Sequence, residues 1–142
     1  MLALGLYGVL QAVDGVALKH AVDAWATAPD TERAARFASA EAIRWLEWSV
    51  HSYHSYLLGT SFPLYGALVA RTAGVPSTVG YIMGLSGLAY IAQGWVIGSP
   101  GFSAANAVST LAGIVFVLTW SVWLLATAWR RDGEKSPTRN SG

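Results

Sequence analysis

Apolar residues are gathered into four long runs, and short polar or turn-forming segments separate them. The runs cover about residues 2–20, 46–70, 79–98 and 107–129, each close to the roughly 20 residues that an α-helix needs to cross a bilayer. Residues 72–129 contain no Asp, Glu, Lys, Arg or His, although about a quarter of an average soluble domain is charged. The pattern therefore predicts an all-α integral membrane protein with four transmembrane helices within residues 1–130.

Short connections between the runs favour an antiparallel up-and-down bundle, because helices joined by few residues pack side by side. Gly74 marks a turn between the second and third runs, and residues 98–101 end the third. Gly80, Gly84 and Gly87 are expected to form one packing face within the chain, where small residues let helix backbones approach closely.

A signal peptide is the alternative interpretation of the first run, since residues 26–28 resemble a small-residue cleavage site. No basic segment precedes the run, however, and Asp14 interrupts it. We therefore interpret residues 2–20 as a short first span.

The second helix is expected to be much longer than a bilayer is thick. Its pattern begins at Asp30 or Thr31, either of which can cap the helix, and continues to Ala70. A straight helix of that length would measure about 60 Å, twice the hydrocarbon thickness. Residues 31–46 should therefore form an amphipathic helix outside the membrane.

A kink is predicted in the second span at Pro63, which lacks the N–H that would bond to the carbonyl of Gly59. Thr60 or Ser61 could instead donate to that carbonyl. The predicted architecture is thus a four-helix bundle with a long, kinked second helix.

Charged residues outside the spans bear on orientation and partners. Arg71 and Arg130 lie on the side that an even number of spans assigns to both termini, which favours a multi-pass protein of the cell membrane with both termini in the cytoplasm. Residues 131–142 are polar and are expected to form a disordered tail. The net charge of +1 gives no reason to expect a nucleic-acid partner, and the absence of cysteine excludes disulfides.

Ionisable and amide side chains inside the predicted spans are the candidates for function, because each is costly in hydrocarbon and needs a partner or a role. Glu47, His51 and His54 are spaced four and three residues apart, so they can face one cleft, with Asp14 at a comparable depth. We expect a polar pocket near the outer end of the spans. Its candidate residues are Gln11, Asp14, Arg44, Glu47, His51, His54 and Gln93.

Three interpretations of this pocket remain open. The first is a hydrogen-bonded network that only joins helices, with Arg44 paired to Glu47 or Asp14. The second is binding of haem or a divalent metal through His51 and His54, with Glu47 as a further ligand, although one helix alone supplies these groups. The third is passage of a proton or small solute through Asp14, Glu47 and His51. Nearby serines lack the spacing of a hydrolase nucleophile elbow.

Several motifs in residues 35–101 resemble a known family. They are Arg44-Trp45-Leu46-Glu47-Trp48, Arg71-Thr72-Ala73-Gly74-Val75-Pro76, Gly80-Tyr81-Ile82-Met83-Gly84-Leu85-Ser86-Gly87-Leu88 and Gln93-Gly94-Trp95. This stretch resembles the bacterial membrane proteins of the domain-of-unknown-function family DUF4386, particularly actinobacterial forms. Members tend to have additional N-terminal spans, so the chain resembles a short form. The resemblance implies a multi-helix membrane fold and no catalytic residue.

The sequence thus favours a non-enzymatic membrane protein, either an accessory that binds a partner or a carrier of a small ligand. Its expected partners are the lipid bilayer and either another membrane protein or a second copy of the chain. No cofactor is expected on this interpretation. The alternative is a redox protein that binds haem or a metal through His51 and His54.

Overall fold

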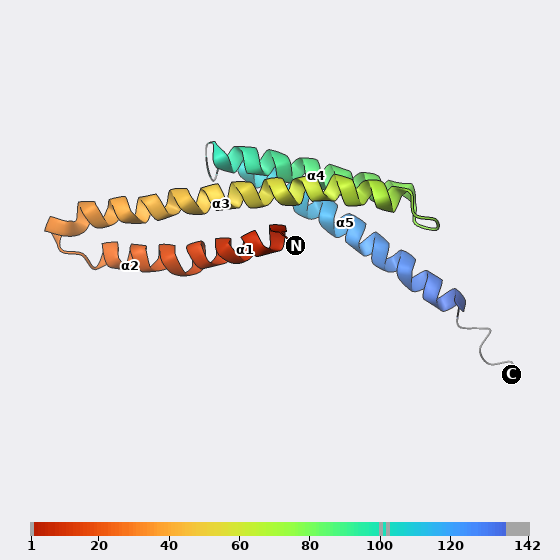
Figure 1. Cartoon of the computed structure of the whole chain (residues 1–142), viewed down its shortest axis with the longest axis horizontal. Coiled ribbons are helices and arrows are strands. Elements are labelled where there is room, and N and C mark those ends of the chain that lie inside the picture. The colour runs from red at the N-terminus through yellow and green to blue at the C-terminus, as the bar shows by residue number, and fades with distance from the viewer. Residues whose placement is uncertain (1, 100, 102, 136–142) are drawn as a thin grey trace.

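The protein is all-helical throughout the part described by the computed structural model, which comprises residues 2–99, 101 and 103–135. The first three elements follow one another without a break and form one rod, which contains a short π-helical segment and which Figure 1 shows beside the longest helix. The elements are α1 (Leu2–Ala12), η1 (Val13–Leu18), α2 (Lys19–Ala26), α3 (Asp30–Ala70), α4 (Ser77–Gly98) and α5 (Ala104–Lys135). The predicted all-α class is confirmed.

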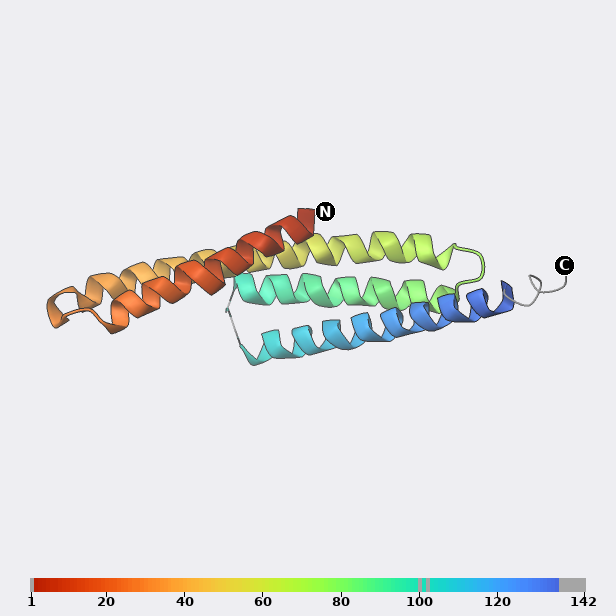
Figure 2. The same cartoon turned by 90° about the horizontal axis from the view of Figure 1, so that it is seen from below.

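The rods are arranged as two units that share α3. The first rod runs antiparallel to the N-terminal half of α3, whereas α4 runs antiparallel to its C-terminal half, and α5 packs on α4 (Figures 1 and 2). Among the described residues, α1 and α2 pack against α3 alone. The structure therefore does not confirm a single four-helix bundle: α3, with 41 residues, is long enough for its neighbours to occupy different halves.

The first unit is an apolar helical hairpin with charged outer positions. The rings of Trp25 and Phe37 meet edge to face, with 5.7 Å between their centroids, and close the hairpin near its turn. Pro29 occupies the cap position of α3, and no side chain makes a cap hydrogen bond there, contrary to the predicted cap at Asp30 or Thr31. Asp30 instead lies in the first turn, where a negative charge suits the helix dipole.

α3 continues as a helix through Pro63, and the structure does not confirm the kink predicted there. The hydroxyl of Thr60 donates to the carbonyls of Tyr56 and Leu57, and the hydroxyl of Ser61 also donates to Leu57. Neither bonds to the carbonyl of Gly59, so that detail of the prediction is wrong. The two hydroxyls reach back along their own helix, as is usual for these residues.

Glycines bring α3 and α4 into backbone contact. A Cβ added at Gly66 would lie 2.5 Å from the carbonyl oxygen of Gly80, and one added at Gly59 would lie 2.8 Å from that of Gly87. At Gly84, by contrast, a Cβ would have no described atom within 4 Å. The predicted packing face therefore has its closest contacts at Gly80 and Gly87, whereas Gly84 meets α3 through its backbone nitrogen, 3.2 Å from a Cβ added at Gly66.

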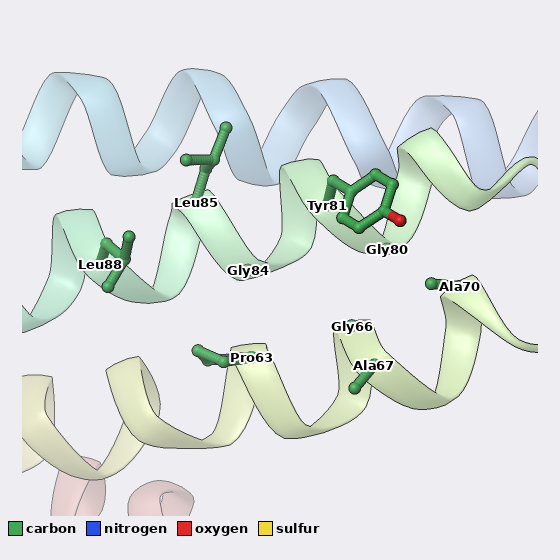
Figure 3. A pocket seen from close by; sticks show the side chains of 9 residues that line it. All are labelled: Pro63, Gly66, Ala67, Ala70, Gly80, Tyr81, Gly84, Leu85 and Leu88. Atoms are coloured by element: carbon green, nitrogen blue, oxygen red, sulfur yellow. The ribbon is translucent and has the colours of Figure 1, made fainter.

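Gly84 borders an apolar hollow of about 470 Å³ on the outer side of this helix pair. Figure 3 shows Tyr81, Leu85 and Leu88 on α4 along one side of it and the smaller side chains of α3 along the other. The glycine packing explains the hollow. The backbones of α3 and α4 approach closely, while the larger side chains of α4 extend past this contact and form a wall beside it.

Polar contacts join α5 to α4. The indole Nε1 of Trp120 donates to the buried hydroxyl of Ser86 across 3.1 Å. The ring of Tyr90 lies over Gly113, where a Cβ would be 3.3 Å from it. The helix continues to Lys135, beyond the predicted end of the span, so the tail predicted for 131–142 is helical as far as that residue. Residues 136–142 lie outside the described part of the chain.

Two helices are long and apolar enough to cross a membrane, Leu2–Ala26 with 25 residues and Ala104–Arg130 with 27. Within the most apolar window of each helix, only 6% of the residues are buried. The rest of the described chain therefore encloses neither helix.

Candidate functional site

A polar cavity of about 220 Å³ lies between the first rod and α3. Tyr7, Leu10, Gln11 and Asp14 line it from the first rod, at the spacing that places side chains on one face of a helix. On α3, Glu47, His51 and His54 share such a face and form the opposite wall. The two helices thus direct several of their polar side chains into one space.

Asp14 lies in the π-helical segment η1, the only such segment in the described chain. A π-helical turn holds one more residue than an α-helical turn, which shifts the face that the following residues present. Such turns are rare and occur frequently at functional sites. Here the segment lies at the level where Asp14 faces Glu47 and His51 across the cavity.

Glu47 is the most deeply buried acidic residue among the described residues, with only 3% of its surface exposed. Its Oε2 lies 3.1 Å from Nη1 of Arg44, one helical turn earlier on α3. The guanidinium of Arg44 also lies over the ring of Trp48, 5.7 Å from the ring centroid. Arg44 therefore balances the charge of Glu47 while its own position is supported by a cation–π contact.

The other polar groups of the cavity retain bonding capacity. Asp14 is exposed and makes no hydrogen bond or ion pair with the described residues, whereas Nδ1 of His54 is buried without a hydrogen-bond partner. The ring of His54 packs against Tyr7, with centroids 5.4 Å apart, and lies 6.4 Å from the ring of His51. The cavity therefore presents a carboxylate and an imidazole nitrogen that are not committed to the protein.

The structure brings together most of the candidate residues named from the sequence. Gln11, Asp14, Glu47, His51 and His54 all line the cavity, and Arg44 pairs with Glu47 from outside its lining.

Gln93 lies elsewhere, between α4 and α5. Tyr7 and Leu10 were not named from the sequence, although their spacing from Gln11 and Asp14 already placed them on the same helix face.

No group of three or more His, Cys, Asp or Glu side chains in the described residues is placed to hold one metal ion. Binding of haem or a metal by His51 and His54 therefore stays a prediction that no contact in the structure favours.

In comparisons with known proteins, no family model, no curated protein and no solved structure matches the chain. The resemblance to DUF4386 therefore stays a prediction from the sequence motifs.

Proposed function

We propose that this chain is an integral membrane protein that acts without catalysis, as a carrier for a proton or a small hydrogen-bond-donating solute. The observation that carries the proposal is the polar cavity itself. The Asp14 carboxylate lines it and can accept hydrogen bonds, Nδ1 of His54 has no partner among the described residues, and Glu47 is held in place by Arg44. A network that only joined helices would be expected to satisfy its members' hydrogen bonds, because unsatisfied polar groups in hydrocarbon are costly.

Exposed apolar side chains support the membrane placement. On α3 they extend from Leu46 through Leu57 to Leu68, a length of about 33 Å and close to the hydrocarbon thickness. On α5 the residues Leu118, Val122 and Leu125 are exposed in the same way. We propose that α3 from about residue 46, together with α4 and α5, crosses the bilayer, with Arg71 and Arg130 on the cytoplasmic side.

In this placement the cavity lies at the outer edge of the hydrocarbon, because Glu47 and His54 occupy the first turns of the α3 span. A solute would thus enter from the aqueous side and meet the acceptors within the membrane. A cytoplasmic N-terminus additionally requires the rod 2–26 to cross the bilayer completely, which is the four-span arrangement of the sequence prediction.

Proton flux into liposomes tests the carrier proposal. Purified protein is reconstituted around a trapped pH-sensitive dye, a potassium gradient with valinomycin sets the membrane potential, and uptake of labelled methylammonium is measured in parallel. We expect flux of one of the two probes above that of empty liposomes. Asp14→Asn should lower it at least tenfold, because the amide keeps the shape of the side chain but removes its charge.

Asp23→Asn is the matched control, since Asp23 pairs with Lys19 on the exposed side of α2, away from the cavity. Its flux should equal that of the parent protein. If neither probe moves, or if both variants behave alike, the carrier proposal is wrong and the accessory function remains. An absorbance scan and metal analysis of the same preparation test the haem or metal alternative.

A further inference from the structure

A second hollow, of about 300 Å³, lies on the other side of α3, where the C-terminal end of α4 packs against it. Ser49, Ser52 and Tyr56 face it, and the helical rotation of 100° per residue places them opposite Glu47 and His51. The two sites therefore lie back to back at one level of α3. Nothing in the proposed carrier function uses this second hollow.

The serine hydroxyls of this hollow present oxygen lone pairs rather than hydrogens. Oγ of Ser49 donates its hydrogen to the carbonyl of Trp45 across 2.8 Å, and Oγ of Ser52 donates to the carbonyl of Gly94 across 2.7 Å. Since each hydroxyl has one hydrogen, both are left as acceptors toward the hollow.

Aromatic rings form much of the remaining wall. Tyr53 and Trp95 are 68% and 69% exposed and line the hollow together with Tyr56, and aromatic rings attract cations to their faces through their quadrupoles. The end of α4, at Gly98 and Ser99, adds the partial negative charge of a helix C-terminus.

The lining contains no charged side chain of either sign. An anion would find few donors there, and a bare metal ion would find none of the carboxylates that it prefers. An organic ammonium group, by contrast, is suited to aromatic faces and hydroxyl lone pairs. We propose that the hollow formed by Tyr53, Tyr56, Trp95 and the end of α4 binds an alkylammonium group, such as the choline of a lipid headgroup or a free choline-like amine.

The position of the hollow makes both sources accessible. In the proposed placement it lies at the same outer edge of the hydrocarbon as Trp45 and Trp48, where lipid headgroups meet the protein. A free amine would reach it from water through the exposed side of Tyr53.

Binding of choline chloride to the full chain in a maltoside detergent tests the proposal, with sodium chloride at equal ionic strength as the reference. Calorimetry should detect saturable choline binding that sodium does not reproduce. Trp95→Leu and Tyr53→Leu should each weaken it roughly 2- to 30-fold, the range that cation–π contacts provide. Tyr53→Phe keeps the aromatic face and should bind as the parent does.

Trp129→Leu is the matched control, because Trp129 is an equally exposed tryptophan on α5, outside the lining. Choline binding that is absent, or that Trp95→Leu and Trp129→Leu weaken equally while both keep the parent's helical circular dichroism, overturns the proposal. Nanodiscs then identify the source. If phosphatidylcholine discs compete with free choline and phosphatidylglycerol discs do not, a lipid headgroup is the natural ligand; equal binding in both discs assigns a free amine.

Discussion

Nε2 of Gln93 donates a hydrogen bond to Oγ1 of Thr110 across 2.8 Å and joins α4 to α5. The same hydroxyl donates to the carbonyl of Asn106, so both partners are committed within the helix pair. Gln93 is thus a structural residue in this arrangement, separate from the cavity in which sequence reasoning placed it.

Gln93→Leu should therefore lower stability without changing carrier flux. Hydrogen bonds between membrane helices contribute about 0.6 kcal/mol on average and up to about 1.7 kcal/mol. Unfolding of Gln93→Leu, Thr110→Val and the double variant in mixed micelles measures the coupling between the two side chains. A coupling energy of zero, or a flux that falls with Gln93→Leu as it does with Asp14→Asn, would contradict this assignment.

Gly80 and Gly84 should respond oppositely to alanine. Gly80→Ala places a methyl group against the backbone of α3 near Gly66 and Ala70, which cannot move aside as a side chain can. Overpacking of this kind costs about 1–3 kcal/mol. Gly84→Ala enters open space and should stabilise the helix by about 0.5–1 kcal/mol. Thermal unfolding of the two variants in one detergent gives the comparison, and equal effects would show that α4 does not pack as described.

Deletion of Gly15 should convert the π-helical segment into regular α-helix. Because a π-helical turn holds one more residue than an α-helical turn, removing one residue leaves Tyr7 and Gln11 on nearly the same side of the rod and changes mainly the backbone next to Asp14. Helical circular dichroism should be unchanged, whereas proton or methylammonium flux should fall at least tenfold because the Asp14 carboxylate is displaced. Gly15→Ala is the control, because a Cβ there has no described atom within 4 Å and the variant should keep its flux. Full flux after the deletion would show that the π-helical segment has no role.

Spin labels at single cysteines test which surfaces meet lipid, and the natural chain has no cysteine to interfere. Leu118→Cys and Leu64→Cys lie on exposed apolar faces of α5 and α3 and should be more accessible to oxygen than to a water-soluble nickel chelate. Arg33→Cys, on the exposed N-terminal part of α3, should show the reverse. Equal nickel accessibility at all three positions would exclude the proposed placement in the bilayer.

Cross-linking distinguishes the observed register of the first rod from a four-span bundle. Leu2 and Leu57 border the same hollow, so a bifunctional thiol reagent should cross-link a Leu2→Cys/Leu57→Cys pair in membranes. In a complete bundle the first rod would be shifted along α3, and Leu2→Cys would instead react with Ala70→Cys. Dominance of the second pair would restore the four-span prediction.

Helical periodicity was sufficient to predict the helices and much of the cavity. The spacing of Glu47, His51 and His54 fixes a common face whatever packs against it, and Asp14 follows from its place in an antiparallel neighbour. How far this neighbour extends beyond the cavity along α3 was not predictable, because its positions before Gln11 are all apolar and fix no partner on α3. The π-helical segment was also missed, since residues 13–18 have an ordinary helical composition.

α3 carries both units of the fold without a loop between them, so it can act as a lever. His51 lies near its middle, with about 30 Å of helix on either side at 1.5 Å per residue. If α3 pivots at the cavity, a sideways displacement of its end at Asp30 moves its other end at Ala70 by a similar distance in the opposite direction. A partner that pulls on the hairpin of α2 and α3 would thereby transmit its force to the end of α3 at Ala70 and change the angle at which the cavity opens.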